Sequence, residues 1–397
     1  MKIVLLTSWP PRHCGIATYS NELARALKEQ GHEVHIVTFS DGGRKSEENV
    51  HPVLKVNKGR KLVQPNWDEA LYREIEKIGP DVVHVQHEYA LYLYDDDFSS
   101  GLFRPFFRWK VDANFPVVAT FHSVYTALDR VESYYMDIVL EIIDAGIVHE
   151  EYQKIYLPEN IGRLPDNVYV IPHGAKDIKP DKSAKNDLGL KGKKVAGLIG
   201  WWEPNKGFER VVKIWPKIRK QVGKNAVLVV AGDARPGSKS GQIYKPKLIK
   251  AIERSSAKSS IKLIVGAFTP QEYDRILSSF DLMVLPYSRA SQSGNLAHAF
   301  ALGVPCIATA MEGLKAEIES SKGGITVPPG DDLELMHGIA HLMKHDELLK
   351  RYARNAAKHV TKQIKWSIVA RKHVALYEKL IGDLREECRP KKKESPF

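Results

Sequence analysis

Apolar residues along the chain follow two alternating patterns. Short, mostly apolar runs such as 1–6, 81–86 and 116–121 are typical of buried strands in parallel sheets. Between such runs, apolar residues recur every three to four positions, as they do from Ile16 to Leu27, which is typical of an amphipathic helix. Another strand follows at 34–37. This strand–helix–strand order is a βαβ unit, so the pattern predicts an α/β fold with helices covering parallel sheets.

The same rhythm restarts in the second half of the chain. A polar, lysine-rich stretch occupies 176–194, and a new strand begins at its end. The chain has 397 residues, more than one ordinary core encloses. We therefore expect a first domain at 1–175 and a second at 176–375. Residues 376–397 are expected to form a C-terminal helix and basic tail that could pack back on the first domain.

The stretch from Leu285 to Thr309 has the features of a ligand site. A buried strand ends near Pro286, a polar loop follows at 288–294, and a helix begins at Asn295. In open α/β sheets, ligands bind beyond the carboxyl ends of strands, where helix N-termini hold phosphate. An ordinary strand-to-helix turn would have the same pattern, so both interpretations stay open.

Two further loops have the placement of phosphate-binding turns. The loop after the first strand has a single glycine, Gly15, so the dinucleotide fingerprint G-x-G-x-x-G is absent. The loop 201–207 ends in Lys206 and Gly207, and it is not a P-loop because no Ser or Thr follows the lysine. Gly15 could let a phosphate approach or form a plain turn. Lys206 could bind phosphate or be a solvated loop lysine.

Two predicted strands end in histidine, one at His87-Glu88 and the other at His122. A lone histidine is more often structural than functional, but two at the same edge and on the same face of one sheet favour a site. The acidic run 95–97 has no further ligand at suitable spacing, so we expect a solvated loop there and no metal.

Composition narrows the possible partners. The formal net charge is +11, but the basic residues are spread out without interleaved aromatics, so we expect no nucleic acid partner. The three cysteines are far apart, and no apolar run reaches roughly 18 residues. We expect no leader, because the sequence starts directly with a predicted strand. We expect a cytoplasmic protein whose basic surplus permits peripheral contact with the inner membrane face.

The motifs, taken in order, are similar to those of retaining glycosyltransferases of family 4, which have the GT-B architecture. Each motif is common alone, but their order is specific for the family. The motifs are Pro10 to Gly15, Thr120 to His122, Ile171 to Gly174, Gly200 to Gly207, Ala267-Phe268, Gly303 with Pro305, Val327 to Asp331, and the helix containing Trp366.

This resemblance implies two Rossmann-like domains that face each other across a cleft, the first on the acceptor side and the second for the nucleotide-sugar. It implies transfer of a glucose- or mannose-type sugar, with retention and without metal or cofactor. The donor would be linked to UDP, GDP or ADP, and the acceptor would be a hydroxyl of a sugar, a polyol or a lipid-linked carrier.

The resemblance also implies roles for individual residues. His122 would contact the donor sugar, Lys206 would neutralise the leaving diphosphate, and the Gly15 amide would touch the diphosphate. The remaining implied contacts are the amides of Ser293, Gly294 and Asn295 with the diphosphate oxygens, the Phe268 backbone with the base, and Glu88 on the acceptor side.

Three departures from the family pattern matter. Trp201 stands where the family usually has arginine, and Ala290 and His298 replace its paired glutamates. The second glutamate usually holds the ribose, so His298 takes that position here. The triplet Gln292-Ser293-Gly294 resembles that of a subgroup in which we place the chain. A sugar-phosphate-dependent disaccharide synthase or phosphorylase, and an inactive sugar-nucleotide-binding homologue, remain alternatives.

Overall fold

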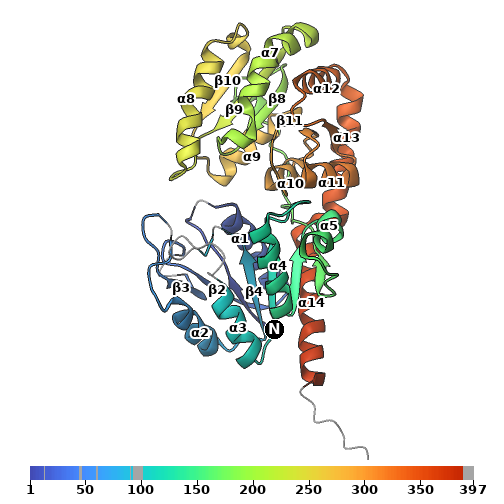
Figure 1. The fold of residues 1–397 in the computed structure, drawn as a ribbon. Helices are drawn as coiled ribbons and strands as arrows, with labels where there is room; N and C mark the ends of the chain where they lie inside the picture. Colours follow the sequence, from blue (N-terminus) through green and yellow to red (C-terminus); the bar gives the residue numbers. More distant parts are fainter. Residues whose placement is uncertain (13, 44–46, 60, 90, 93–101, 388–397) are drawn as a thin grey trace, which may run out of the picture. The chain divides into compact units, whose positions relative to one another are not determined.

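The computed structural model describes residues 1–397 except 13, 44–46, 60, 90, 93–101 and 388–397. The acidic run 95–97 and most of the basic tail therefore lie outside the described residues. The chain forms two compact units (Figure 1): Met1–Gly174 together with Trp366–Phe397, and Ala175–Lys365. In the part of the chain that is described, no helix is both long and apolar enough to cross a membrane.

The first unit is built on a seven-stranded parallel sheet of order β3-β2-β1-β4-β5-β6-β7. Its strands are β1 (Lys2–Leu6), β2 (Glu33–Phe39), β3 (Val50–Leu54), β4 (Val82–His87), β5 (Val117–Phe121), β6 (Ala145–Val148) and β7 (Val168–Val170). Its helices are α1 (Gly15–Glu29), α2 (Trp67–Ile78), α3 (Phe103–Asp112), α4 (Arg130–Ile142), α5 (Glu151–Ile161) and α14 (Trp366–Glu387).

Both faces of this sheet are covered, because side chains alternate along each strand. In β1, Ile3 and Leu5 pack with α1 and α14 on one face. Val4 and Leu6 point to the opposite face and pack with α2, α3 and α4. The sheet therefore separates two apolar layers, as the continuous apolar runs predict for parallel strands.

The second unit repeats this plan with a six-stranded parallel sheet of order β10-β9-β8-β11-β12-β13. Its strands are β8 (Lys194–Ile199), β9 (Ala226–Gly232), β10 (Ile261–Val265), β11 (Leu282–Leu285), β12 (Cys306–Thr309) and β13 (Gly324–Val327). Its helical segments are α6 (Ala184–Asp187), η1 (Pro204–Lys206), α7 (Phe208–Val222), α8 (Lys239–Glu253), η2 (Lys258–Ser260), α9 (Pro270–Ser278), α10 (Gly294–Ala301), α11 (Glu312–Ser321), α12 (Asp332–Lys344), α13 (Asp346–His359) and η3 (Val360–Ile364).

The predicted fold class is confirmed: both units are parallel α/β layers. The strand order reverses between β1 and β4 in the first unit and between β8 and β11 in the second. Such reversals open a crevice at the carboxyl ends of the two diverging strands. They therefore mark where each unit can bind a ligand.

The chain passes from one unit to the other at positions that differ from the expected boundaries. Ala175 donates its amide to Ile364 and forms a parallel bridge with Lys365, all within the second unit. Trp366 already belongs to the first unit, where its ring lies 5.0 Å from that of Tyr19. The return to the first unit thus comes before residue 376, because Trp366 packs into the layer between the first sheet and α1.

Candidate active site

The first turn of α1 presents backbone amides at the carboxyl end of β1. Cys14 is the N-cap of this helix and makes no side-chain cap hydrogen bond. Gly15 is exposed, and a Cβ built on it would meet no atom within 4 Å. The first amides of a helix have no intrahelical partners and carry the positive end of its dipole. An anion can therefore approach Gly15 without a side chain in the way.

His122 follows the carboxyl end of β5 and is held from several sides. Its Nε2 lies 2.9 Å from Oε1 of Gln86, on the neighbouring strand β4. The Tyr19 ring meets the imidazole edge-on at 4.8 Å, and the His149 ring lies 5.2 Å away. Burial lowers the pKa of His122 well below its usual value, and the charges of His149 and His173 lower it further. His122 is therefore a neutral hydrogen-bonding group at neutral pH.

His87 does not share a face with His122, so that expectation was wrong. In the β4–β5 register, His87 lies opposite Phe121, and His122 is one residue further on. The His87 side chain therefore points into the other layer, where Nε2 lies 2.9 Å from the Tyr135 hydroxyl. Glu88 lies next along the chain and accepts a hydrogen bond of 2.5 Å from the Ser123 hydroxyl.

Lys206 lies at the carboxyl end of the second sheet. The backbone turns there at Gly207, whose φ is +62° and where an added Cβ would fall 2.4 Å from the Pro286 carbonyl oxygen. This close approach brings the loop against the end of β11. The Lys206 ammonium nitrogen lies 3.7 Å from the centroid of the buried Tyr287 ring. The ring face holds the cation at the strand reversal.

The N-terminus of α10 adjoins the same tyrosine. The side-chain amide nitrogen of Asn295 donates to the Ile199 carbonyl at 3.1 Å and to the Tyr287 hydroxyl at 3.3 Å, while its oxygen accepts from Tyr273 at 2.9 Å. Ser293 caps the helix, and Gly294 is exposed at its first position. Lys206 and Asn295 thus contact the same Tyr287 side chain, and the structure brings these two predicted residues together.

The other predicted residues of the second unit lie around this point. The side-chain nitrogen of Gln292 is buried without a hydrogen-bond partner among the described residues. Phe268 follows β10 and packs partly buried against the core. His298 is on the next turn of α10, where its Nε2 lies 2.6 Å from Asp274 and its ring packs on Tyr273. Both of these contacts of the His298 side chain are with α9.

Comparison with known proteins identifies the fold and the class of enzyme. Residues 14–177 match the family described as Glycosyltransferase Family 4, and residues 180–359 match Glycosyl transferases group 1. The chain is a GT-B glycosyltransferase.

Several relatives and solved structures match this chain over nearly its full length and over nearly their own. An uncharacterized glycosyltransferase of Methanocaldococcus jannaschii is 24% identical, over 95% of this chain and 98% of that protein. The N-acetyl-alpha-D-glucosaminyl L-malate synthase of Bacillus anthracis is 22% identical, over 96% and 98%. Sucrose-phosphate synthase of Thermosynechococcus elongatus superposes with a TM-score of 0.77 at 19% identity, over 96% of this chain and 100% of that one. Anabaena HepE in complex with UDP gives 0.76 at 16%, with the same coverage.

Sequence reasoning about this glycosyltransferase missed the aromatic surroundings of both sites. Around His122 these are Tyr19, His149, His173 and Trp366. A signal did exist, because His149 comes directly after β6 and His173 comes shortly after β7, so that three consecutive strands each lead to a histidine. Tyr287 gave no comparable signal, because its role depends on the approach of a loop from a distant part of the chain.

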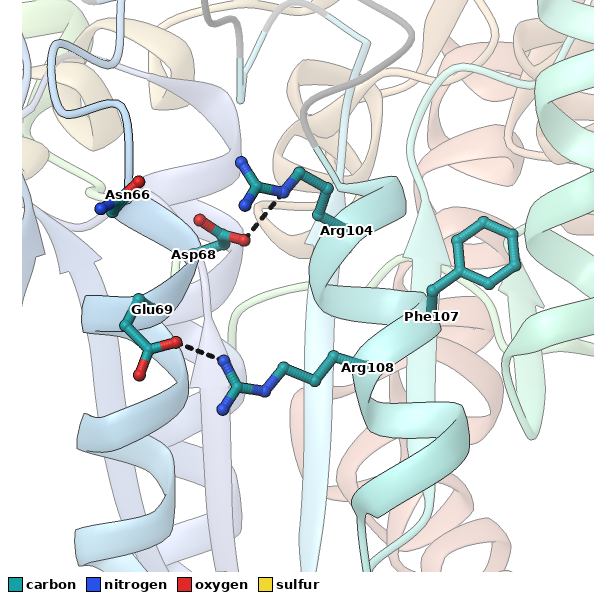
Figure 2. Close-up of a pocket in the computed structure, with 6 residues that line it drawn as sticks. All are labelled: Asn66, Asp68, Glu69, Arg104, Phe107 and Arg108. Atoms are coloured by element: carbon teal, nitrogen blue, oxygen red, sulfur yellow. Dashed lines mark hydrogen bonds and ion pairs between the residues drawn. The ribbon is translucent and has the colours of Figure 1, made fainter.

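A hollow of about 640 Å³ lies between α2 and α3 in the first unit (Figure 2). Asp68 pairs with Arg104 at 3.0 Å, and Glu69 pairs with Arg108 across it. These helices cover the face of the sheet opposite to α1 and α14, so the hollow is separate from the surroundings of His122. Among the described residues, no group of three His, Cys, Asp or Glu side chains is placed to hold a metal ion.

Proposed function

We propose that this glycosyltransferase moves a glucose- or mannose-type sugar from a nucleotide-diphosphate donor to an acceptor hydroxyl. The observation that carries the proposal is the meeting of the Lys206 ammonium and the α10 N-terminus at Tyr287. A cation and free helix amides at a strand reversal suit a diphosphate. The neighbour HepE supports a nucleotide donor, since its structures are described as complexes with UDP and with UDP-glucose.

The chemical demand is a diphosphate leaving group that gains negative charge as the glycosidic bond breaks. We assign its neutralisation to Lys206 and to the amides of Ser293, Gly294 and Asn295. Preorganised donors of this kind contribute roughly 3–4 kcal/mol each to transition-state stabilisation. This donor set can serve the purpose for which other enzymes use a metal ion, so the proposed reaction is metal-independent and needs no cofactor.

Three further contacts belong to the proposal. The Gly15 amide is assigned to binding phosphate, and the Phe268 backbone is assigned to the base. His122 binds the donor sugar, for which a neutral imidazole is suited because a sugar hydroxyl can both donate and accept a hydrogen bond. Glu88 is assigned to the acceptor side.

We further propose retention of anomeric configuration, which rests on the family resemblance. The leaving phosphate would take the acceptor proton on the same face of the sugar. The unpartnered Gln292 nitrogen supports a ligand-binding role for the Gln292-Ser293-Gly294 triplet, since buried donors without partners are costly. His298 stands at the position proposed for the ribose contact.

The acceptor class is proposed from relatives. The names of matched proteins include an N-acetyl-alpha-D-glucosaminyl L-malate synthase, a D-inositol 3-phosphate glycosyltransferase and a phosphatidyl-myo-inositol mannosyltransferase. They support a sugar, polyol or lipid-linked hydroxyl. The net charge of +11 would favour anionic acceptors or peripheral contact with the cytoplasmic membrane face.

Thermal unfolding with UDP, GDP and ADP tests the donor site, because a ligand that binds only the folded state raises the melting temperature. Hydrolysis or transfer with UDP-glucose and GDP-mannose then tests the chemistry. Absence of any shift with all three nucleotides would remove the proposed donor site. A shift without turnover would favour an inactive homologue, and turnover that depends on phosphate would favour a phosphorylase.

A further inference from the structure

A row of buried polar side chains joins His122 to the last described helix of the chain. His122 Nε2 lies 2.9 Å from Gln86 Oε1, and the Gln86 amide nitrogen lies 3.1 Å from His84 Nε2. His84 Nδ1 lies 2.6 Å from the hydroxyl of Tyr377 in α14. His84, Gln86 and Tyr377 are all completely buried. The row therefore runs inside the first unit, from the carboxyl end of β5 to α14.

Every member of this row is neutral. Burial lowers the pKa of His84 well below its usual value, with smaller effects of the charges on His373 and His149. Burial also raises the pKa of Tyr377, so its hydroxyl keeps its proton. A neutral imidazole carries one N–H and one lone pair. Each hydrogen bond in the row therefore determines the direction of the next.

The observed arrangement has one consistent set of protons. His122 Nε2–H donates to the Gln86 oxygen, and the Gln86 amide donates to His84 Nε2. The remaining proton of His84 is then on Nδ1 and points to the Tyr377 oxygen. Thr120 lies 2.7 Å from the same His84 Nε2, so its hydroxyl and the Gln86 amide share the one lone pair of that nitrogen. The Gln86 contact thus leaves His122 with its proton on Nε2.

A second arrangement satisfies the contacts of the row, and it reverses each of them. Tyr377 would donate to His84 Nδ1, His84 Nε2–H would donate to a turned Gln86, and His122 would carry its proton on Nδ1. The four residues therefore change together, and the Tyr377 hydroxyl belongs to either set. Half-satisfied buried networks are costly, so intermediate states are disfavoured.

We propose that Tyr377 is a positioning residue for His122: as the partner of His84 Nδ1 at the end of the row, it holds the row in one of these two sets and so keeps His122 in a single tautomer. A second contact of the same helix supports this, since Trp366 packs on Tyr19, whose ring meets His122. The consequence for turnover rests on the proposed role of His122 at the donor sugar. The tautomer itself does not depend on that role.

The test compares two substitutions, each of which removes a tyrosine hydroxyl from a hydrogen bond made by α14. Tyr377→Phe removes the end of the row. Tyr169→Phe is the matched control, because Tyr169 accepts a 2.8 Å hydrogen bond from Lys379 of the same helix and lies outside the row. Nitrogen-15 NMR of the histidine side chains reports the His122 tautomer, and steady-state kinetics with the sugar nucleotide that the enzyme turns over report kcat and KM.

We expect one His122 tautomer, protonated on Nε2, in the natural protein and in Tyr169→Phe. Tyr377→Phe should give a mixture of tautomers and lower kcat on the order of tenfold, as for the loss of a residue that orients a functional imidazole. Nucleotide binding should stay unchanged, because the diphosphate is held by other groups. Gln86→Met, which breaks the row beside His122, should reproduce these effects if Tyr377→Phe folds poorly.

An unchanged tautomer in both Tyr377→Phe and Gln86→Met would overturn the proposal, and so would altered tautomers with kcat equal to that of Tyr169→Phe. If the natural protein neither binds nor turns over any sugar nucleotide, the proposed function fails instead. The NMR comparison then decides by itself whether Tyr377 controls the tautomer.

Discussion

Each of the two units contains its own parallel sheet in which the strand order reverses. The side chains at the carboxyl ends of the strands differ between the two units. Among the described residues of the first unit, four histidines are buried, namely His84, His87, His149 and His373. No histidine of the second unit, whose five all lie in the described part of the chain, is buried. There, Lys206, helix amides and Asn295 surround Tyr287.

Under the proposed function, these two sets of residues suit different chemical groups of a sugar nucleotide. A diphosphate is anionic, so a cation and helix amides suit it. A sugar is neutral, so directional hydrogen bonds from uncharged groups suit it, and burial keeps the imidazoles uncharged. Three kinds of experiment test the comparison. Acid protonates the buried histidines of the first unit, Lys206→Ala removes a charge from the second, and a glycine in each unit is replaced by alanine.

Acid should produce the largest effect, and mainly in the first unit. Burial lowers the pKa of His87 and His149 to about 3 and that of His373 to about 4, compared with 6.5 for a free histidine. Because the unfolded chain binds these protons more tightly, stability is complete above about pH 6.5 and decreases as the pH falls toward the folded-state values. A histidine whose pKa is lower by about 2 in the folded state than in the unfolded state lowers the free energy of unfolding by about 2.7 kcal/mol, once it is protonated in both states.

Hydrogen exchange measured segment by segment from pH 7.5 to 5 would check this prediction. Amides of β4, β5 and β6 should lose protection before those of β8, β9 and β11. The substitution His373→Leu should make the stability of the first unit depend less steeply on pH. If the amides of both units lost protection equally as the pH falls, the buried histidines of the first unit would not be the cause of the acid sensitivity.

Removing the cation of the second unit should be next in size. We expect Lys206→Ala to lower kcat by at least about tenfold and up to about a thousandfold, as losses of one charge-stabilising donor do. The free energy of unfolding of this variant should fall by only about 1 kcal/mol, because the variant loses the contact between the Lys206 ammonium and the Tyr287 ring. Lys213→Ala removes an exposed lysine of α7 and serves as the control. Steady-state kinetics that are the same for both variants would remove Lys206 from the mechanism.

The two glycines should respond in opposite ways. A Cβ at Gly15 meets nothing, so Gly15→Ala should keep the melting temperature and weaken nucleotide binding about tenfold, the effect of ~1.4 kcal/mol. Gly207→Ala places a Cβ against Pro286 in a left-handed backbone, so it should destabilise the protein by at least about 1–2 kcal/mol. Calorimetry of unfolding and of UDP binding distinguishes the two. Normal nucleotide binding by Gly15→Ala would remove that amide from the proposed site.

The sequence was sufficient to predict the sheets and the loops at their carboxyl ends. Continuous apolar runs define parallel strands, and the polar stretches after them contain Gly15, Lys206 and Gly294. Side-chain direction was harder to predict. His87 and His122 end neighbouring strands, but the register pairs His87 with Phe121, and one residue of offset reverses the face.

Individual long-range contacts could not be predicted. His84 and Tyr377 are 293 positions apart, and their hydrogen bond depends on which helix covers the first sheet. The apolar stripe of the last helix predicts that it is buried, but it does not show which unit buries it. For the same reason the sequence places the second boundary after residue 375, whereas the compact units divide before Trp366.

The first unit is discontinuous, and this determines when it can be completed during synthesis. Its sheet and α1 are translated first, but the helix that covers the same face, α14, is made after the entire second unit. Until that helix leaves the ribosome, apolar residues such as Val118 and Ile147 lack part of their cover. The nascent chain can therefore finish its second unit before its first, and truncation ahead of Trp366 would leave a surface that chaperones recognise.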